Sequence, residues 1–151
     1  MKLEDSVTLP CGRETAWAAL NDADVLRQCI PGCEELLQDA PDHMAAKVAL
    51  KVGPVKAKFA GEVTLSEIKP PESYFLSGEG KGGVAGFAKG SALVRLEQVS
   101  TEETILHYSA SADVGGKLAQ IGSRMLDSTA QRLARQFFDK FRDCVSAKAG
   151  V

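Results

Sequence analysis

The stretch KLAQIGSRMLDSTAQRLARQFFDKFRDCV, residues 117–145, contains no proline and repeats its apolar residues at helical spacing. Its apolar positions are Leu118, Ile121, Met125, Leu133, Phe137 and Phe141, and charged residues lie mostly on the other side. At 1.5 Å per residue, this pattern predicts one amphipathic helix of about eight turns, roughly 45 Å long. A helix of this kind buries its apolar stripe, so the rest of the chain must supply the surface that covers it.

That surface is predicted to be a sheet, because apolar and polar residues alternate through much of residues 34–114. HMAAKVALKV (43–52) and VKAKFAGEVTLSEI (55–68) are joined by Gly53 and Pro54, which suit a tight hairpin turn. Three further strands are expected in YFLSGEGKG (74–82), GSALVRLEQV (90–99) and ETILHYSASADV (103–114). LEDSVTL (3–9) alternates in the same way and ends before Pro10, so it is expected to be the first strand.

Two short helices are predicted between the first strand and the others. The first covers Arg13 to Leu20, and the second runs from Asp22 to about Cys29, with Asn21 or Asp22 as its cap and Pro31-Gly32 as its stop. The order is therefore one strand, two short helices, about six antiparallel strands and a long closing helix, which is an α+β arrangement. A chain of 151 residues has the size of one domain, expected over 1–146 with a short tail at 147–151.

Composition and charge exclude several classes of protein. The apolar share of 44% and the charged share of 25% are typical of a globular domain, and the net charge of −2 gives no reason to expect a nucleic-acid partner. The N-terminus lacks the apolar core of a secretory signal, so we expect a cytoplasmic protein. The cysteines at 11, 29, 33 and 144 form no C-x-x-C pair and the two histidines stand alone, so we expect buried thiols and no metal site.

A second informative stretch is SGEGKGGVAGFAKGSA, residues 77–92, which holds six glycines. Gly78, Gly80 and Gly83 match the pattern G-x-G-x-x-G, which binds phosphate where it follows a strand and opens a helix. Here the stretch continues into a strand, so no phosphate site is expected. Small residues also gather on the apolar face of the neighbouring strands, which fits either close packing of the helix on the sheet or an apolar cavity for a ligand.

Four sequence blocks carry a resemblance to a known family. LNDADVLRQCIPGCEEL, KVALKVGPVKAKFAGEVTL, PPESYFLSGEGKGGVAGFAKGSALVRL and DVGGKLAQIGSRMLDSTAQRLARQFF together resemble the CoxG family, named after a subunit of carbon monoxide dehydrogenase, over about residues 1 to 145. This family lies within the START-like helix-grip (SRPBCC) superfamily. The resemblance implies a curved antiparallel sheet of about seven strands, wrapped around a long C-terminal helix with an apolar tunnel between them.

The resemblance also implies a function. The family implies an accessory protein of a molybdenum-containing carbon monoxide dehydrogenase or a related molybdenum hydroxylase. It is linked to membrane attachment of the enzyme, so peripheral contact with the inner face of the membrane is expected. The implied ligand is a quinone, menaquinone or ubiquinone, or a lipid, and no covalently bound cofactor is expected. Longer relatives carry a C-terminal extension thought to contact the membrane, whereas this sequence ends at DCVSAKAGV, so we do not expect an anchor of that kind.

If the interior holds a ligand, its lining is expected to come from the inward face of the strands and from the start of the long helix. Phe87 is isolated among glycines, and we expect it on a mobile loop near the opening. The predicted ligand-binding residues are Ala57, Phe59, Gly61, Val63, Leu76, Gly78, Phe87, Ala110, Ala112, Leu118, Ile121, Gly122 and Met125.

Catalysis is not expected, because the inward parity of the central strands carries no acid, base or histidine. His107, Glu62 and Glu79 fall on the outward parity, and Tyr108 is the single inward candidate. One alternative is a structural assembly or docking factor with a solid interior, and another is a cyclase or hydrolase of the same fold. For docking, Lys47, Lys51, Lys56 and Lys58 form a basic stripe that would face an acidic enzyme surface or anionic lipid, or simply solvent.

Overall fold

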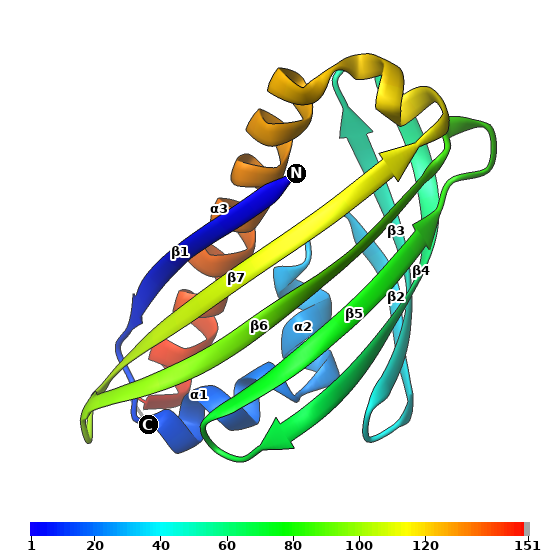
Figure 1. The fold of residues 1–151 in the computed structure, drawn as a ribbon. Helices are drawn as coiled ribbons and strands as arrows, with labels where there is room; N and C mark the ends of the chain where they lie inside the picture. The colour runs from blue at the N-terminus through cyan, green and yellow to red at the C-terminus, as the bar shows by residue number, and fades with distance from the viewer. Residues whose placement is uncertain (150–151) are drawn as a thin grey trace.

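Seven antiparallel strands form one curved sheet, and the longest helix lies along its concave side in the computed structural model, which describes residues 1–149 (Figure 1). The sheet order is β1-β7-β6-β5-β4-β3-β2, so β1 and β2 are its two edges. The strands are β1 (Lys2–Leu9), β2 (Cys33–Ala40), β3 (His43–Val52), β4 (Val55–Lys69), β5 (Ser73–Lys81), β6 (Phe87–Ser100) and β7 (Glu103–Gly115). The helices are α1 (Arg13–Leu20), α2 (Ala23–Cys29) and α3 (Ser123–Ala149), with two 3-10 turns, η1 (Gly83–Ala85) and η2 (Gly116–Ile121). The α+β fold expected from the sequence is confirmed.

The two short helices begin and end close to the predicted residues. Asp22 caps α2, because its carboxylate accepts hydrogen bonds from the backbone N–H groups of Asp24, at 2.9 Å, and Val25, at 3.4 Å. These helices fill one end of the concave face together with the last turns of α3 (Figure 1). Trp17 of α1 belongs to this packing, since its ring meets Tyr74 edge-on at 5.5 Å between ring centroids.

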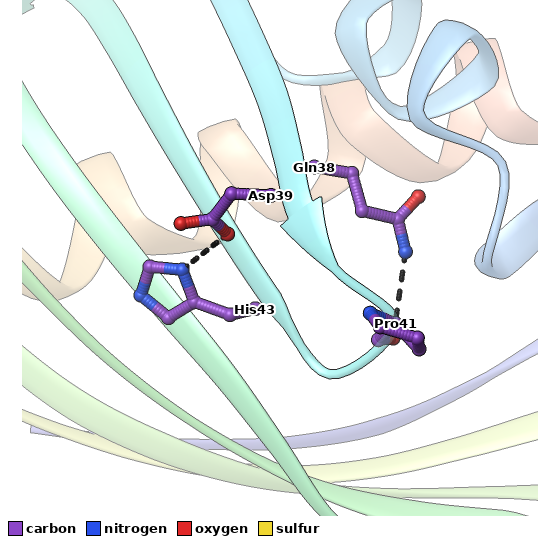
Figure 2. Close-up of polar contacts among 4 residues, drawn as sticks. All are labelled: Gln38, Asp39, Pro41 and His43. Carbon is purple, nitrogen blue, oxygen red and sulfur yellow. Dashed lines mark hydrogen bonds and ion pairs between the residues drawn. The ribbon is translucent and has the colours of Figure 1, made fainter.

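Two tight hairpins organise the edge of the sheet formed by β2, β3 and β4. Gly53 turns the chain between β3 and β4 with φ of +58°, a conformation that glycine adopts without strain. In the hairpin between β2 and β3, His43 Nδ1 and Asp39 Oδ1 lie 2.5 Å apart, and the Gln38 amide nitrogen donates to the Pro41 carbonyl at 3.4 Å (Figure 2). Local side-chain contacts therefore reinforce this connection.

The long closing helix starts later than the sequence predicts. Residues 116–121 form the 3-10 turn η2, and α3 begins only at Ser123, because Gly122 has φ of +98° and interrupts the helix. The break changes the buried face: Leu126 turns inward and Met125, which we expected in the apolar stripe, is 45% exposed. At the other end α3 continues to Ala149, so the predicted tail at 147–151 begins within the helix, and 150–151 lie outside the described residues.

The core is divided into two apolar clusters along the length of the sheet. The larger one joins α1, α2 and the end of α3 to β1, β6 and β7, and centres on Leu9, Leu106, Phe141 and Val145, all at most 1% exposed. The smaller one lies at the opposite end, where Val52, Phe59, Ala85 and Leu118 are buried. The candidate ligand site lies near this smaller cluster, between the sheet and α3.

Candidate functional site

The faces of the strands agree with the predicted alternation. In β4 the odd-numbered residues from Val55 to Leu65 are buried or half-buried, and Lys56, Lys58, Ala60 and Glu62 are exposed. The even-numbered residues of β7 point inward in the same way. The concave face is therefore apolar, as the sequence indicates, and it carries small side chains along several rows that cross the sheet.

One such row runs across five strands through direct register partners. Ala46 of β3 pairs with Gly61 of β4, Gly61 with Gly80 of β5, Gly80 with Ala88 of β6, and Ala88 with Val114 of β7. A Cβ atom built on Gly80 would meet only the Phe59 Cβ, at 4.0 Å, and one on Gly61 would come no closer than 3.6 Å to another heavy atom. This row therefore leaves open space above the sheet.

An apolar cavity of about 240 Å³ lies at this place, between the sheet and the first turns of α3. The sheet side is formed by β3 to β7, and the helix side by η2 and α3. Its lining consists of Met1, Val48, Leu50, Val52, Phe59, Gly80, Ala88, Val114, Leu118, Leu126, Thr129, Ala130 and Leu133. Larger hollows lie on the surface, such as one of about 430 Å³ between β1 and α3, but charged side chains line it, among them Lys2, Asp5 and Arg135. Of these two, the cavity between the sheet and α3 has the apolar walls that a hydrophobic ligand needs.

The cavity is shifted along the sheet from the predicted site. Of the thirteen predicted residues, Phe59 and Leu118 line it, and Ala57 and Ile121 pack in the apolar cluster beside it. Val63 and Leu76 instead pack against the larger cluster, where α1 and α2 fill the concave face. Gly61, Gly78, Ala110 and Ala112 have the inward parity that we expected but lie outside the lining. The strand residues named here share the expected inward parity, and two of the thirteen predicted residues line this cavity.

Three predicted positions require a different description. Phe87 is the first residue of β6 and not part of a loop, and it lies on the exposed parity of that strand, with its ring against Gly115. Met125 lies against the Gly53 turn outside the cavity. Gly122 serves the backbone: its φ of +98° ends η2, and no heavy atom lies within 4 Å of the position of its Cβ. None of these three residues is part of the cavity lining.

The glycines of residues 77–92 serve several purposes. Gly82 gives room to the ring of Phe59, since a Cβ at this position would lie 2.5 Å from Phe59 Cε1. Gly86 and Gly116 allow two backbones to meet, with a Cβ on Gly116 only 2.7 Å from the Gly86 Cα. Gly80 leaves space in the cavity. The sequence left two interpretations open, and each holds for some of the glycines. Gly82, Gly86 and Gly116 allow close packing, and Gly80 leaves open volume in the cavity.

The cavity offers apolar side chains and one hydroxyl group. Within residues 1–149, Thr129 is its one polar side chain, 8% exposed, and neither acid, base nor histidine lines it. Tyr108 points inward but stacks on Phe138, with ring centroids 5.0 Å apart, outside the lining; burial raises its pKa, and so does the nearby Asp5. His107 lies on the outward parity beside Glu97 at 2.8 Å. Met1, which also lines the cavity, donates a hydrogen bond from its N-terminal amino group to the Ala112 carbonyl at 3.2 Å.

Neighbouring elements account for the lining residues that the sequence analysis missed. Val48, Leu50 and Val52 share the inward parity of β3, which the alternation in HMAAKVALKV already indicated. Leu133 already belonged to the predicted apolar stripe, whereas Leu126, Thr129 and Ala130 follow from a helix that starts at Ser123, so they required knowledge of the Gly122 break. Among residues 1–149, no group of three or more His, Cys, Asp or Glu side chains gathers in a way that could hold a metal ion.

The basic stripe is solvent-exposed on the outer face, and its four lysines differ in their partners. Lys47 lies 3.6 Å from Glu35 and Lys58 lies 3.6 Å from Glu34, both acids of β2. Lys51 and Lys56 are direct register partners, so two positive charges face each other next to the Gly53 turn. The charge of the stripe is therefore concentrated at its end beside that turn.

Comparison with known proteins identifies the relatives of this chain. The model of a family described as the CoxG subunit of carbon monoxide dehydrogenase matches residues 6–146. A solved structure of a conserved protein from Geobacillus kaustophilus is 34% identical, with 97% of this chain and 96% of that chain covered and a TM-score of 0.91. A comparison with curated proteins finds no match.

More distant solved structures share the fold. A START superfamily protein from Mycobacterium smegmatis is 12% identical with a TM-score of 0.74, and each chain is covered over 97% of its length. The ZhuI aromatase/cyclase from Streptomyces sp. R1128 is 15% identical with a TM-score of 0.67, and the match covers 97% of this chain and 93% of that one. No helix in residues 1–149 combines the length and the apolar character needed to cross a membrane.

Proposed function

The chain belongs to the CoxG family of carbon monoxide dehydrogenase, and we propose that it is a non-catalytic accessory protein of a molybdenum hydroxylase that binds an apolar ligand between sheet and helix. In this proposal the enzyme is carbon monoxide dehydrogenase, the ligand is a quinone or a lipid, and the protein helps to couple the enzyme to the membrane. The observation that carries the proposal is the cavity of about 240 Å³, whose lining is apolar except for Thr129.

The size of the cavity limits what part of a ligand it can take. An apolar cavity of about 150 Å³ holds a benzene ring. The larger volume here has room for a substituted or bicyclic ring such as the head of a quinone, or for a short run of an acyl chain. A long isoprenoid tail or a whole lipid exceeds this volume, so most of it would have to lie outside.

The polarity of the lining fits the same class of ligand. A ligand buried among Leu, Val, Phe and Ala side chains gains free energy in proportion to the apolar area removed from water, about 25 cal/mol per Å². The Thr129 hydroxyl can donate one hydrogen bond, for example to a carbonyl oxygen, and it would fix the orientation of the ring. The lysine stripe of Lys47, Lys51, Lys56 and Lys58 stays a predicted docking surface, either for an acidic enzyme surface or for anionic lipid.

The proposal is tested by native mass spectrometry of protein purified from its own host, followed by organic extraction and identification of any released compound. We expect a stoichiometric quinone or lipid, or uptake of added menaquinone or ubiquinone by empty protein. The matched variants are Gly80→Leu, which fills the cavity from the sheet side, and Ala60→Leu, which adds a leucine side chain on the exposed face of β4.

The two variants separate binding from folding. Gly80→Leu should abolish uptake while the protein stays folded, because the added side chain occupies the cavity and not the packed core. Ala60→Leu should bind as the unmodified protein does. If the unmodified protein is empty and takes up neither quinone, or if Gly80→Leu unfolds the domain, the interior is packed, and the chain acts as a docking factor without ligand.

A further inference from the structure

Three connections meet at the end of the molecule next to the cavity (Figure 1). They are the turn between β3 and β4, the segment Gly82–Gly86 with η1, and η2 with the first turn of α3. The Met125 sulfur and Ile121 lie against the Gly53 turn, and the Gly86 backbone lies against Gly115 and Gly116. These contacts hold the three connections together as one surface, which we call the tip.

The tip carries apolar side chains that the core does not use. Val84 is 86% exposed at the outermost part of the Gly82–Gly86 segment, and Phe87 and Met125 are each 45% exposed on the adjoining strand and helix. Val84 follows Gly83, whose φ is +59°, and precedes Ala85, which is 3% exposed and anchors the segment to the cluster below. The fold therefore anchors this segment firmly and still directs an apolar residue into solvent.

Positive charge surrounds these apolar side chains. Lys51, Lys56, Lys81, Lys117 and Arg124 are all exposed, and none of them makes an ion pair with another residue in the part of the chain that the structure describes. The nearest acids on β5 and β7, Glu79 and Asp113, each lie opposite Lys89 in the register. Asp127 is one turn further along α3. In a chain with a net charge of −2, the tip is thus a local basic region.

We propose that the tip docks on the surface of an anionic phospholipid bilayer. A basic rim around isolated apolar side chains matches such a surface, because lipid phosphates attract the cations and the acyl boundary accepts the apolar groups. Val84, Phe87 and Met125 come from three different segments, namely the Gly82–Gly86 connection, β6 and α3. A fluid lipid interface can accommodate separate apolar side chains without matching pockets, whereas a protein partner needs a complementary surface.

The tip lies directly beside the cavity. What this juxtaposition means for a ligand rests on the proposed function. At three places one residue belongs to the tip and the next residue in the chain lines the cavity: Lys51 and Val52, Lys117 and Leu118, Met125 and Leu126. A bilayer in contact with the tip would therefore lie one side-chain layer from the cavity. A ligand whose tail exceeds the cavity could leave that tail in the lipid.

The test is co-sedimentation of the purified full chain with phosphatidylcholine vesicles and with vesicles that contain 30 mol% phosphatidylglycerol (about one lipid in three). We expect binding to the anionic vesicles only, weakened by added salt. The double variant Lys51→Gln/Lys56→Gln should bind roughly 20- to 30-fold more weakly, at about fivefold for each lysine. Its matched control is Lys47→Gln/Lys58→Gln, two lysines of the same strands that face Glu35 and Glu34 and should matter far less.

The apolar part of the tip has its own pair of variants. Val84→Asp should weaken binding to anionic vesicles by more than about tenfold, because a carboxylate replaces the most exposed apolar side chain. Leu93→Asp places the same charge on the exposed face of β6, away from the tip, at a leucine that is 50% exposed, and should have a smaller effect. Thermal melting of each variant confirms that it is folded.

The outcomes also separate this proposal from the proposed function. If the unmodified chain binds neither kind of vesicle, or if tip and control variants lose binding equally, the tip proposal is wrong. Uptake of menaquinone is measured separately in detergent solution, without vesicles. If the chain takes up menaquinone normally but binds no vesicles, only the proposal about the tip is wrong. If vesicle binding depends on the tip but no variant takes up menaquinone, the ligand proposal is wrong and the proposal about the tip is supported.

Discussion

The ring of Phe59 occupies the space that a side chain at residue 82 would need: a Cβ atom built on Gly82 would lie 2.5 Å from Phe59 Cε1. Gly82 has φ of −116°, which any residue can adopt, so the ring and not the backbone conformation requires glycine here. The contact ties the segment Gly82–Gly86 to β4 and positions the wall of the cavity, because Phe59 lines it.

This contact predicts that Gly82→Ala lowers the free energy of unfolding by about 1–3 kcal/mol, the usual effect of overpacking. Urea unfolding measures it. The control is Gly83→Ala, where the space around the Cβ is empty and only the positive φ of +59° opposes the substitution, at a cost of roughly 1 kcal/mol. In the double variant, Phe59→Leu replaces the ring by a smaller side chain and should relieve part of the destabilisation caused by Gly82→Ala. Equal destabilisation by Gly82→Ala with either residue at 59 would contradict this interpretation.

Local signals in the sequence were sufficient for most of the fold. The helix capped by Asp22 and the hairpin between β3 and β4 were predicted because capping, turn residues and a two-residue period act within a few residues of each other. The long helix shows where such signals fail. Leu118, Ile121 and Met125 keep helical spacing across Gly122, and periodicity cannot reveal that the backbone at Gly122 turns to positive φ.

The position of the cavity depended on information that periodicity does not contain. Alternation identifies the inward face of each strand, but the row that Gly80 shares with Ala88 and Val114 follows from the register between strands. The other end of the concave face is filled by α1, α2 and Phe141, and Ala110 and Ala112 lie outside the cavity lining. Alternation was therefore sufficient for the inward parity of the strands, while the place of the cavity along them follows from register and packing.

The single hydroxyl among the described lining residues gives a prediction about ligand chemistry. Thr129→Val keeps the size of the side chain and removes the hydrogen-bond donor, so a ligand with a carbonyl should bind roughly two- to tenfold more weakly. Calorimetric titration with 2-methyl-1,4-naphthoquinone measures this, with 2-methylnaphthalene as the oxygen-free comparison. The hydrocarbon should bind both proteins equally. Equal weakening for both compounds would mean that Thr129 acts through packing and not through its hydroxyl.

The cysteines lead to a prediction about reactivity. Burial raises the pKa of the Cys29 thiol to about 12, with a further contribution from Cys144, whose sulfur lies 4.0 Å away. Burial also raises the pKa of Cys11, which is 1% exposed. Because the thiolate is the reactive form, iodoacetamide at pH 8 should label the half-buried Cys33 first and reach Cys11 and Cys29 only after unfolding. Peptide mapping by mass spectrometry checks this order, and labelling of Cys29 as fast as Cys33 would disprove it.

The hairpin contact of Figure 2 predicts a dependence on pH. The hydrogen bond that the His43 ring donates to the Asp39 carboxylate raises the pKa of His43 above its ordinary 6.5, and the same bond lowers the pKa of Asp39 below 3.8. Stabilisation by His43 is therefore complete below about pH 6.5 and is lost as pH rises through its folded pKa, while that by Asp39 is lost as pH falls through its own lowered pKa. The pair should stabilise the hairpin most between these limits. An NMR titration should place the pKa of His43 above 6.5 in the unmodified chain and closer to 6.5 in Asp39→Asn. An unchanged titration in that variant would show that the contact is absent in solution.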